Sequence, residues 1–292
     1  MSQSPRTLSA TELEQFHRDG FLVVRGLLSH DEALTWREHY MALHALGPVE
    51  GYFSPKPLEE INGDMLRAYP RMLHPHRWDE TSRRYLLDAR FEAVLTALFG
   101  EEPVAAQSMF YFKPPGARGQ ALHQDDFYLK TSPGHCMAAW LSLDDTDSQN
   151  GGLFVVPGSH KLPILCPHAA DLRKSFTIEE LDVPQGMEVV PVNLETGDCL
   201  FFNGAVIHGS EPNVTQDRFR RSLILHFVPR STAAMSQWFS PLVRFSGEEI
   251  HCADAETGGP CGTDELEALR RGLLAQGELA RSGLEQGAIA MP

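Results

Sequence analysis

The order of apolar and polar positions over the first 46 residues predicts a helix, a short strand and a second helix. Ser9, with a glutamate three residues later, has the spacing of a capping box, whose two side chains satisfy free backbone N–H groups at a helix start. Gly20 is suited to end this helix, because glycine adopts a left-handed backbone without strain. Residues 21–24 are an apolar run of strand length, and Ser29 repeats the capping signal for a helix to about Leu46.

After residue 46 the chain changes first to an irregular segment and then to β-rich runs. Residues 47–80 carry five prolines, which predicts a long loop, and residues 80–99 have a helical pattern. From about residue 104, short apolar runs are separated by Gly, Pro, Asn and Asp, which predicts an antiparallel sandwich or barrel. These runs are 108–113, 122–128, 137–143, 153–156, 187–192, 199–203 and 221–228.

The sequence therefore predicts one domain over residues 1–292, mostly β with flanking helices. Residues 8–100 form a helical support, residues from about 104 to 230 form the β core, and residues 263–292 form a helical tail with little apolar pattern.

Composition narrows the possible partners. The net charge of −14 argues against nucleic acid and anionic membranes. No apolar leader and no run of 18 apolar residues is apparent, so we expect a cytoplasmic protein that spans no membrane. The oligomeric state is not indicated. The cysteines are odd in number and scattered, and we expect reduced thiols at all five positions, which are 136, 166, 199, 252 and 261.

The strongest chemical signal is His123-Gln124-Asp125, followed by His208. On an extended chain His123 and Asp125 would project from the same face, so an imidazole and a carboxylate could take adjacent corners of a metal ion. A histidine from another strand would complete a face of three ligands and leave other positions open, as in non-heme iron oxygenases. His160 or His226 could equally be the third ligand on this reasoning.

Six segments in and around these residues occur in an order that is typical of a known family. They are Phe16–Leu27, His123–Asp125, Asn150–His160, Gly197–Phe202, His208–Asn213 and Arg220–Ser222. With these segments in this order, the chain resembles the phytanoyl-CoA dioxygenase family of iron(II)- and 2-oxoglutarate-dependent oxygenases, from about Leu8 to Val228. The last sixty or so residues carry none of the resemblance.

The resemblance implies a double-stranded β-helix, the cupin-like jelly roll, with iron(II) held by His123, Asp125 and His208. It also implies 2-oxoglutarate and O₂ as cosubstrates. The intact carboxylate at Asp125 favours hydroxylation over halogenation, because the related halogenases replace this ligand with a small residue.

A 2-oxoglutarate ligand also needs a cation for its far carboxylate, and the planar fork of arginine suits that role. Arg218 and Arg220 share a face with Ser222, whereas Arg221 points the other way. The resemblance favours Arg220 as the anchor, with Arg221 as the alternative. It further implies Ser210 as a hydroxyl donor, with Trp140 and Met109 as cosubstrate neighbours, and Arg71 as a further residue that reaches the pocket.

We therefore expect an enzyme that hydroxylates a small organic substrate and releases succinate and CO₂. The alternatives are a non-oxygenase jelly roll, such as a cupin-like isomerase or hydrolase, and a sensor on the same fold; neither needs an arginine anchor. The substrate is not indicated. Residues 47–80 combine prolines and glycines with large apolar side chains, which predicts a lid over the pocket or a static loop packed on the sheet.

Overall fold

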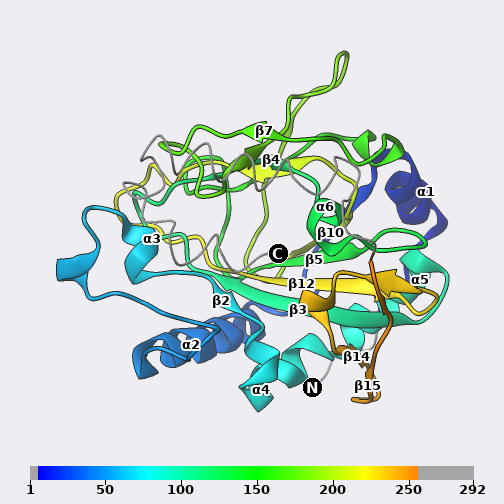
Figure 1. The fold of residues 1–292 in the computed structure, drawn as a ribbon, viewed down its shortest axis with the longest axis horizontal. Coiled ribbons are helices and arrows are strands. Elements are labelled where there is room, and N and C mark those ends of the chain that lie inside the picture. Colours follow the sequence, from blue (N-terminus) through cyan, green and yellow to red (C-terminus); the bar gives the residue numbers. More distant parts are fainter. Residues whose placement is uncertain (1–5, 256–292) are drawn as a thin grey trace.

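The computed structural model describes residues 6–255 of the chain. The helical tail expected at 263–292 lies outside these residues. Two β-sheets face each other, with helices on the outer side of the larger one (Figure 1). This arrangement confirms the expected jelly roll with flanking helices.

The larger sheet has eight strands that pair antiparallel, in the order β1-β10-β5-β12-β3-β14-β15, with β2 also paired to β3. Its strands are β1 (Phe21–Val24), β10 (Cys199–Asn203), β5 (Met137–Ser142), β12 (Ser222–Pro229), β3 (Pro103–Tyr111), β14 (Leu242–Arg244), β15 (Glu249–Ile250) and β2 (Met72–Leu73).

The smaller sheet has four antiparallel strands in the order β4-β11-β6-β9. They are β4 (Gln120–His123), β11 (His208–Ser210), β6 (Leu153–Val155) and β9 (Val190–Val192). Two short pairs lie outside both sheets: β7 (His168–Ala169) with β8 (Glu179–Glu180), and β13 (Ala234–Met235) with β16 (Ala253–Asp254).

The side-chain alternation of β12 shows how the two faces of the larger sheet are used. Leu223, Leu225 and Phe227 pack outward into the core beneath the helices, whereas Ile224 packs inward between the sheets. Alternate residues of the central strands therefore line the interior between the sheets. The candidate chemical groups lie in this interior.

Both predicted capping boxes are present, and Gly20 ends the first helix with a φ of 82°. The helical region predicted at 80–99 is divided, because Asp88 caps a new helix there. The helices are α1 (Ala10–Asp19), α2 (His30–Leu46), α3 (Met65–Ala68), α4 (Glu80–Leu86), α5 (Ala89–Phe99) and α6 (Asp126–Leu129), with 3₁₀ turns η1 (Leu58–Glu60), η2 (Pro75–Arg77), η3 (Ser159–Lys161) and η4 (Gln237–Phe239).

The strand predicted at 122–128 is wrong beyond His123. Asp125 has helical backbone angles of φ −64° and ψ −34°, and α6 follows it directly. The Asp126 N–H donates to the Gly204 carbonyl, a contact that local sequence does not reveal. His123 and Asp125 therefore converge because the chain turns into a helix between them, not because they alternate along a strand.

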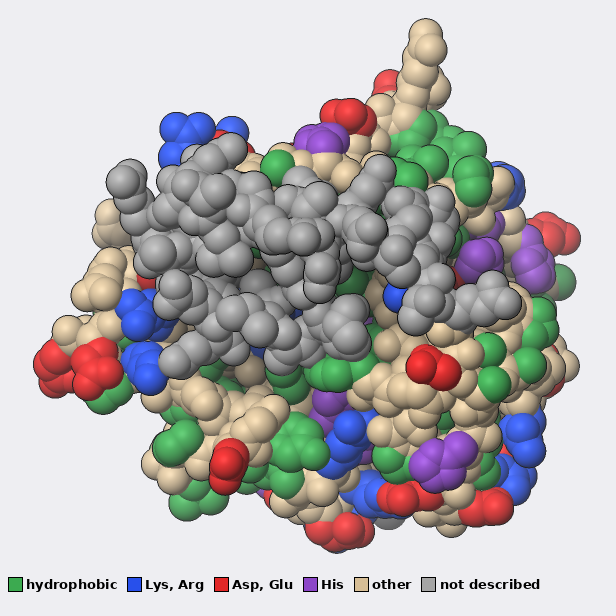
Figure 2. Space-filling view, in the orientation of Figure 1, with side chains coloured by type: hydrophobic (Ala, Val, Ile, Leu, Met, Phe, Trp, Pro, Cys, Tyr) green, Lys and Arg blue, Asp and Glu red, His purple; other side chains and the backbone are tan. Residues whose placement is uncertain are grey.

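The described surface agrees with part of the expectation from composition. Lys and Arg side chains are interspersed with acidic ones over the described part of the face in Figure 2. Among residues 6–255, no helix is both long and apolar enough to cross a membrane.

The expectation of reduced cysteines holds for Cys136, Cys199 and Cys252 but is wrong for Cys166, which is disulfide-bonded.

Candidate active site

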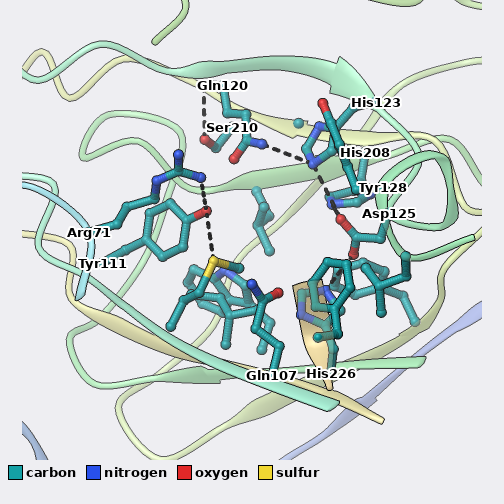
Figure 3. A pocket seen from close by; sticks show the side chains of 18 of the residues that line it. Arg71, Gln107, Tyr111, Gln120, His123, Asp125, Tyr128, His208, Ser210 and His226 are labelled. Carbon is teal, nitrogen blue, oxygen red and sulfur yellow. Dashed lines mark hydrogen bonds and ion pairs between the residues drawn. The ribbon is translucent and has the colours of Figure 1, made fainter. Parts of the chain in front are cut away.

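The three residues of the predicted metal site lie together between the sheets (Figure 3). His123 ends β4, and His208, its cross-strand partner, begins β11. Asp125 lies at the start of α6. One ligand atom from each residue lies within 4.8 Å of the others, and all three side chains are buried. His160 is not part of this group, because its Nε2 lies 3.3 Å from the carbonyl oxygen of His17 on α1.

Both imidazoles are held by a backbone carbonyl two residues earlier. Nδ1 of His123 lies 2.9 Å from the Ala121 oxygen, and Nδ1 of His208 lies 3.0 Å from the Val206 oxygen. Because a carbonyl only accepts hydrogen bonds, each Nδ1 carries the proton and each Nε2 keeps its lone pair. The amide of Gln120 donates to Nε2 of His123 over 3.0 Å, which agrees with a lone pair on this nitrogen.

The two carboxylate oxygens of Asp125 have different partners. Oδ1 lies 3.5 Å from Nε2 of His123 and 3.7 Å from Nε2 of His208. Oδ2 accepts a hydrogen bond of 2.9 Å from Nε2 of His226. His226, which the sequence left open as a third ligand, instead lies on the far side of the carboxylate and fixes its orientation.

The charges of the cluster favour deprotonated ligands. Burial opposes ionisation of Asp125, but the neighbouring His208, His226 and His123 more than offset it, so the pKa of this carboxyl lies well below its usual value. Burial, assisted by the nearby His123, lowers the pKa of His208 to about 4. An ionised carboxylate and neutral imidazoles are the forms that bind a metal ion.

The donor set fits a metal that keeps open coordination positions. Two imidazole nitrogens and one carboxylate oxygen make up the group, and no cysteine of residues 6–255 belongs to it. Structural zinc sites usually close a shell of four protein ligands. Two histidines and one carboxylate on a single face suit non-heme iron, which needs further positions for its cosubstrates.

Arg220 lies in the same pocket with a buried charge. It is 2% exposed, and among the described residues no carboxylate forms an ion pair with it. Nε donates to the Gly151 carbonyl over 3.0 Å, Nη1 donates to Ser222 Oγ over 2.7 Å, and the guanidinium lies 5.2 Å from the Trp140 ring centre. Burial lowers the pKa of Arg220 to about 10. A buried cation without an ion-pair partner among the described residues suits an anionic ligand.

Ser210 lines the pocket and is itself held by a second buried cation. Lys113 Nζ donates to Ser210 Oγ over 2.8 Å and to the carbonyls of Gly151 and Glu211 over 3.2 and 2.5 Å. Burial and then the charge of Arg220 bring the pKa of Lys113 well below its usual value. Gly151 permits this approach, because a Cβ there would lie 2.4 Å from Lys113 Cδ.

The remaining predicted residues also reach the pocket. Trp140 and Met109 line it from β5 and β3. Arg71 lines it as well, with Nη1 donating to the Tyr111 hydroxyl over 3.2 Å. The other arginines considered are paired elsewhere: Arg218 with Asp147 and Arg221 with Asp144.

Sequence reasoning missed the roles of His226 and Lys113. The signal for His226 was its place in the apolar run 221–228, where a histidine two residues from Ile224 shares the inward face. Lys113 gave less signal, because its backbone has a positive φ of 35° and leaves the regular strand.

Comparison with known proteins gives a family and a fold. A model of the phytanoyl-CoA dioxygenase (PhyH) family matches residues 16–222. Phytanoyl-CoA dioxygenase 1 of rice (Oryza sativa subsp. japonica) is 31% identical over 162 residues, which cover 52% of this chain and 54% of that protein. Phytanoyl-CoA dioxygenase domain-containing protein 1 of Bos taurus is 27% identical over 279 residues, covering 80% of this chain and 95% of that protein.

Solved structures agree on the fold. The non-heme alpha ketoglutarate dependent epimerase SnoN from nogalamycin biosynthesis superposes with a TM-score of 0.60 at 22% identity, covering 75% of this chain and 81% of that chain.

Proposed function

Because the chain belongs to the phytanoyl-CoA dioxygenase family of iron(II)- and 2-oxoglutarate-dependent oxygenases, we propose that it hydroxylates a small organic substrate and releases succinate and CO₂. The observation that carries this proposal is the joint presence, in one pocket, of a face of three metal ligands and a buried arginine without a carboxylate partner among the described residues.

We assign His123, Asp125 and His208 as the iron ligands. The carbonyls of Ala121 and Val206 hold the two imidazoles with Nε2 facing inward, and a metal would take the place of the Gln120 amide at Nε2 of His123. Iron(II), when bound with 2-oxoglutarate and O₂, supplies the oxidation, in which one oxygen atom goes to the substrate and the other to succinate.

We assign Arg220 to the far carboxylate of 2-oxoglutarate, with Ser210 as a second donor. Lys113 and the Gln120 backbone N–H both donate to Ser210 Oγ, over 2.8 and 3.2 Å. The Ser210 proton is therefore free to donate to a carboxylate. Trp140 forms the wall against the Arg220 guanidinium, and Met109 lies on the same side of the pocket.

Hydroxylation is favoured within this class because a carboxylate occupies position 125, whereas halogenases of the related branch leave that metal position free. A non-oxygenase jelly roll would keep metal-binding histidines but would have no use for the buried charge of Arg220. A solvated surface arginine costs a protein little, whereas an arginine 2% exposed has lost most of its hydration.

The test is reconstitution with iron(II) and measurement of succinate released from 2-oxoglutarate in the presence of candidate substrates. His208→Ala should weaken iron binding by more than the roughly 10–100-fold that loss of an outer-shell partner causes, and should abolish succinate release. His160→Ala is the matched control, because the sequence offers this histidine as an alternative third ligand but its ring lies against α1. Iron binding that depends on His160 and not on His208 would overturn the ligand assignment.

A further inference from the structure

Two buried polar side chains of the pocket have no partner for one of their nitrogens. Gln107 on β3 and His226 on β12 are each 2% exposed, and both line the pocket. Nε2 of Gln107 and Nδ1 of His226 make no hydrogen bond within residues 6–255. The two residues are direct cross-strand partners, and Figure 3 shows their side chains beside each other below Asp125.

The missing hydrogen bonds are costly for the fold. A buried polar group without a partner destabilises a protein by about 1–3 kcal/mol, and most such groups are satisfied. Polar atoms left open in a pocket are therefore suited to a ligand. The hydrogen bond between His226 and the proposed metal ligand Asp125 uses Nε2 and leaves Nδ1 open.

The two open nitrogens have opposite hydrogen-bonding character. Gln107 Nε2 is a donor. His226 donates through Nε2, because the carboxylate oxygen that it meets only accepts, and in the tautomer that this hydrogen bond selects the lone pair lies on Nδ1, which accepts. A carboxylate would face the lone pair of His226, and an ammonium would face the N–H groups of Gln107. A single hydroxyl can satisfy both atoms.

We propose that Gln107 and His226 form the substrate subsite and that they bind a neutral donor–acceptor group, a hydroxyl, on a largely apolar substrate. This proposal rests on the proposed oxygenase function. The neighbouring lining residues Leu129 and Phe239 are apolar and suit an aliphatic or ring body. Because His226 also holds Asp125 through Nε2, this subsite adjoins the proposed metal ligands in the same pocket.

The distinguishing variant is Gln107→Met, which keeps the length and volume of the side chain and removes its amide. If Gln107 serves a ligand only, this change removes an unsatisfied buried group, and the melting temperature should stay equal or rise. If Gln107 serves the fold through buried water, the melting temperature should fall. Gln149→Met is the matched control, because Gln149 is exposed outside the pocket.

Binding is measured with three probes of one shape: cyclohexanol, cyclohexanecarboxylate and cyclohexylammonium. Each is titrated anaerobically into protein loaded with iron(II) and 2-oxoglutarate, and the change in the visible charge-transfer absorption of the chelate is followed. We expect cyclohexanol to bind most tightly. Gln107→Met should weaken cyclohexanol binding about three- to tenfold, because one neutral hydrogen bond is lost. Gln149→Met should leave the affinity for cyclohexanol unchanged.

Three binding results would overturn the subsite. They are a failure of cyclohexanol to bind the loaded wild type, tighter binding of either charged probe, and equal affinity of the wild type and Gln107→Met for cyclohexanol. A fall of several degrees in the melting temperature of Gln107→Met would also overturn it. If the wild type shows no charge-transfer absorption with iron(II) and 2-oxoglutarate, the proposed function itself fails, and the subsite fails with it.

Discussion

Arg220 and Arg221 are adjacent in sequence, yet their side chains point to opposite sides of the sheet. Arg221 pairs with Asp144 through Nε and Nη2, over 2.7 and 2.8 Å. Arg220 points into the pocket and meets Ser222 and the Gly151 carbonyl. The alternation that the sequence predicted for these arginines is therefore present, and only one of the two charges is available to a ligand in the pocket.

Arg220→Ala should raise the KM for 2-oxoglutarate at least about 30-fold, because a buried charge-assisted contact of about 2–5 kcal/mol is lost. Arg221→Ala should leave this KM nearly unchanged and lower the melting temperature instead, since it leaves Asp144 with one cation fewer. Succinate release at varied 2-oxoglutarate concentration measures the first effect, and thermal unfolding measures the second. A reversal of the two KM effects would mean that Arg221 is the anchor.

Lys113 acts on the same end of the pocket through Ser210. Its Nζ holds Ser210 Oγ at 2.8 Å and also bridges two backbone carbonyls. Lys113→Met should raise the KM for 2-oxoglutarate roughly tenfold with a smaller change in kcat, because a hydrogen bond from a charged group contributes about 1.5–3 kcal/mol and only positioning is lost. Adding Ser210→Ala to the Lys113→Met variant should then raise this KM only a little further. Additive effects of the two changes on KM would show that Lys113 acts independently of Ser210.

At the scale of elements, the sequence predicted best where signals are local. The two capping boxes and Gly20 place α1 and α2 correctly, since the groups they satisfy lie within a few residues. The strand at 122–128 failed because the turn after His123 depends on a contact with Gly204, far along the chain. His208 was expected on a strand, but β11 was not marked as a run of its own, since three residues give no pattern until a neighbouring sheet supplies their hydrogen bonds.

Residues 47–80 show how an irregular segment can be built into the fold. Phe53 and Met72 are buried in the core beneath the large sheet, β2 pairs with β3, and Asp64 pairs with Arg118. Of the two interpretations of this segment, lid or static loop, this packing favours the static one. Its longest exposed run is 57–60, around Leu58, which is 64% exposed, and shorter exposed stretches lie at 50–51 and 62–63.

Limited proteolysis tests this interpretation. We expect cleavage within 47–80 to be confined to its exposed stretches at 50–51, 57–60 and 62–63, because backbone packed on the sheet must unfold before a protease can bind it. The pattern should be the same with and without 2-oxoglutarate, a redox-inert metal and substrate. Protection of the segment when these ligands are added would instead identify it as a lid.

For the whole molecule, the sequence identified the proposed ligands and Arg220 better than the residues that hold them in position. His123, Asp125, His208 and Arg220 come together as expected, because each lies in a short motif with a characteristic neighbourhood. Their supporting groups come from distant segments. The carboxylate of Asp125 is held by a residue 101 positions away, and only the closed pair of sheets brings them into contact.

Two buried histidines outside the proposed ligand set should lower the free energy of unfolding of this protein in acid. Burial, with the charge of Arg77, lowers the pKa of His74 to about 2 and that of His76 to about 3. His74 is 2% exposed and His76 is 4% exposed, and His76 Nδ1 lies 2.6 Å from Ser108 Oγ. In the unfolded chain both rings would titrate near a pKa of about 6.5.

Because the folded pKa values lie below the unfolded ones, the unfolded chain binds more protons between about pH 6.5 and pH 3, and the free energy of unfolding must fall as pH falls through that window. Each histidine contributes up to about 1.4 kcal/mol per pH unit. His76→Gln should therefore make the free energy of unfolding depend less steeply on pH between pH 6 and pH 4, by the equivalent of about one bound proton. Urea unfolding at several pH values measures this slope. His30→Gln, at an exposed helix start, is the control. An unchanged slope in His76→Gln would show that His76 is protonated in the folded protein.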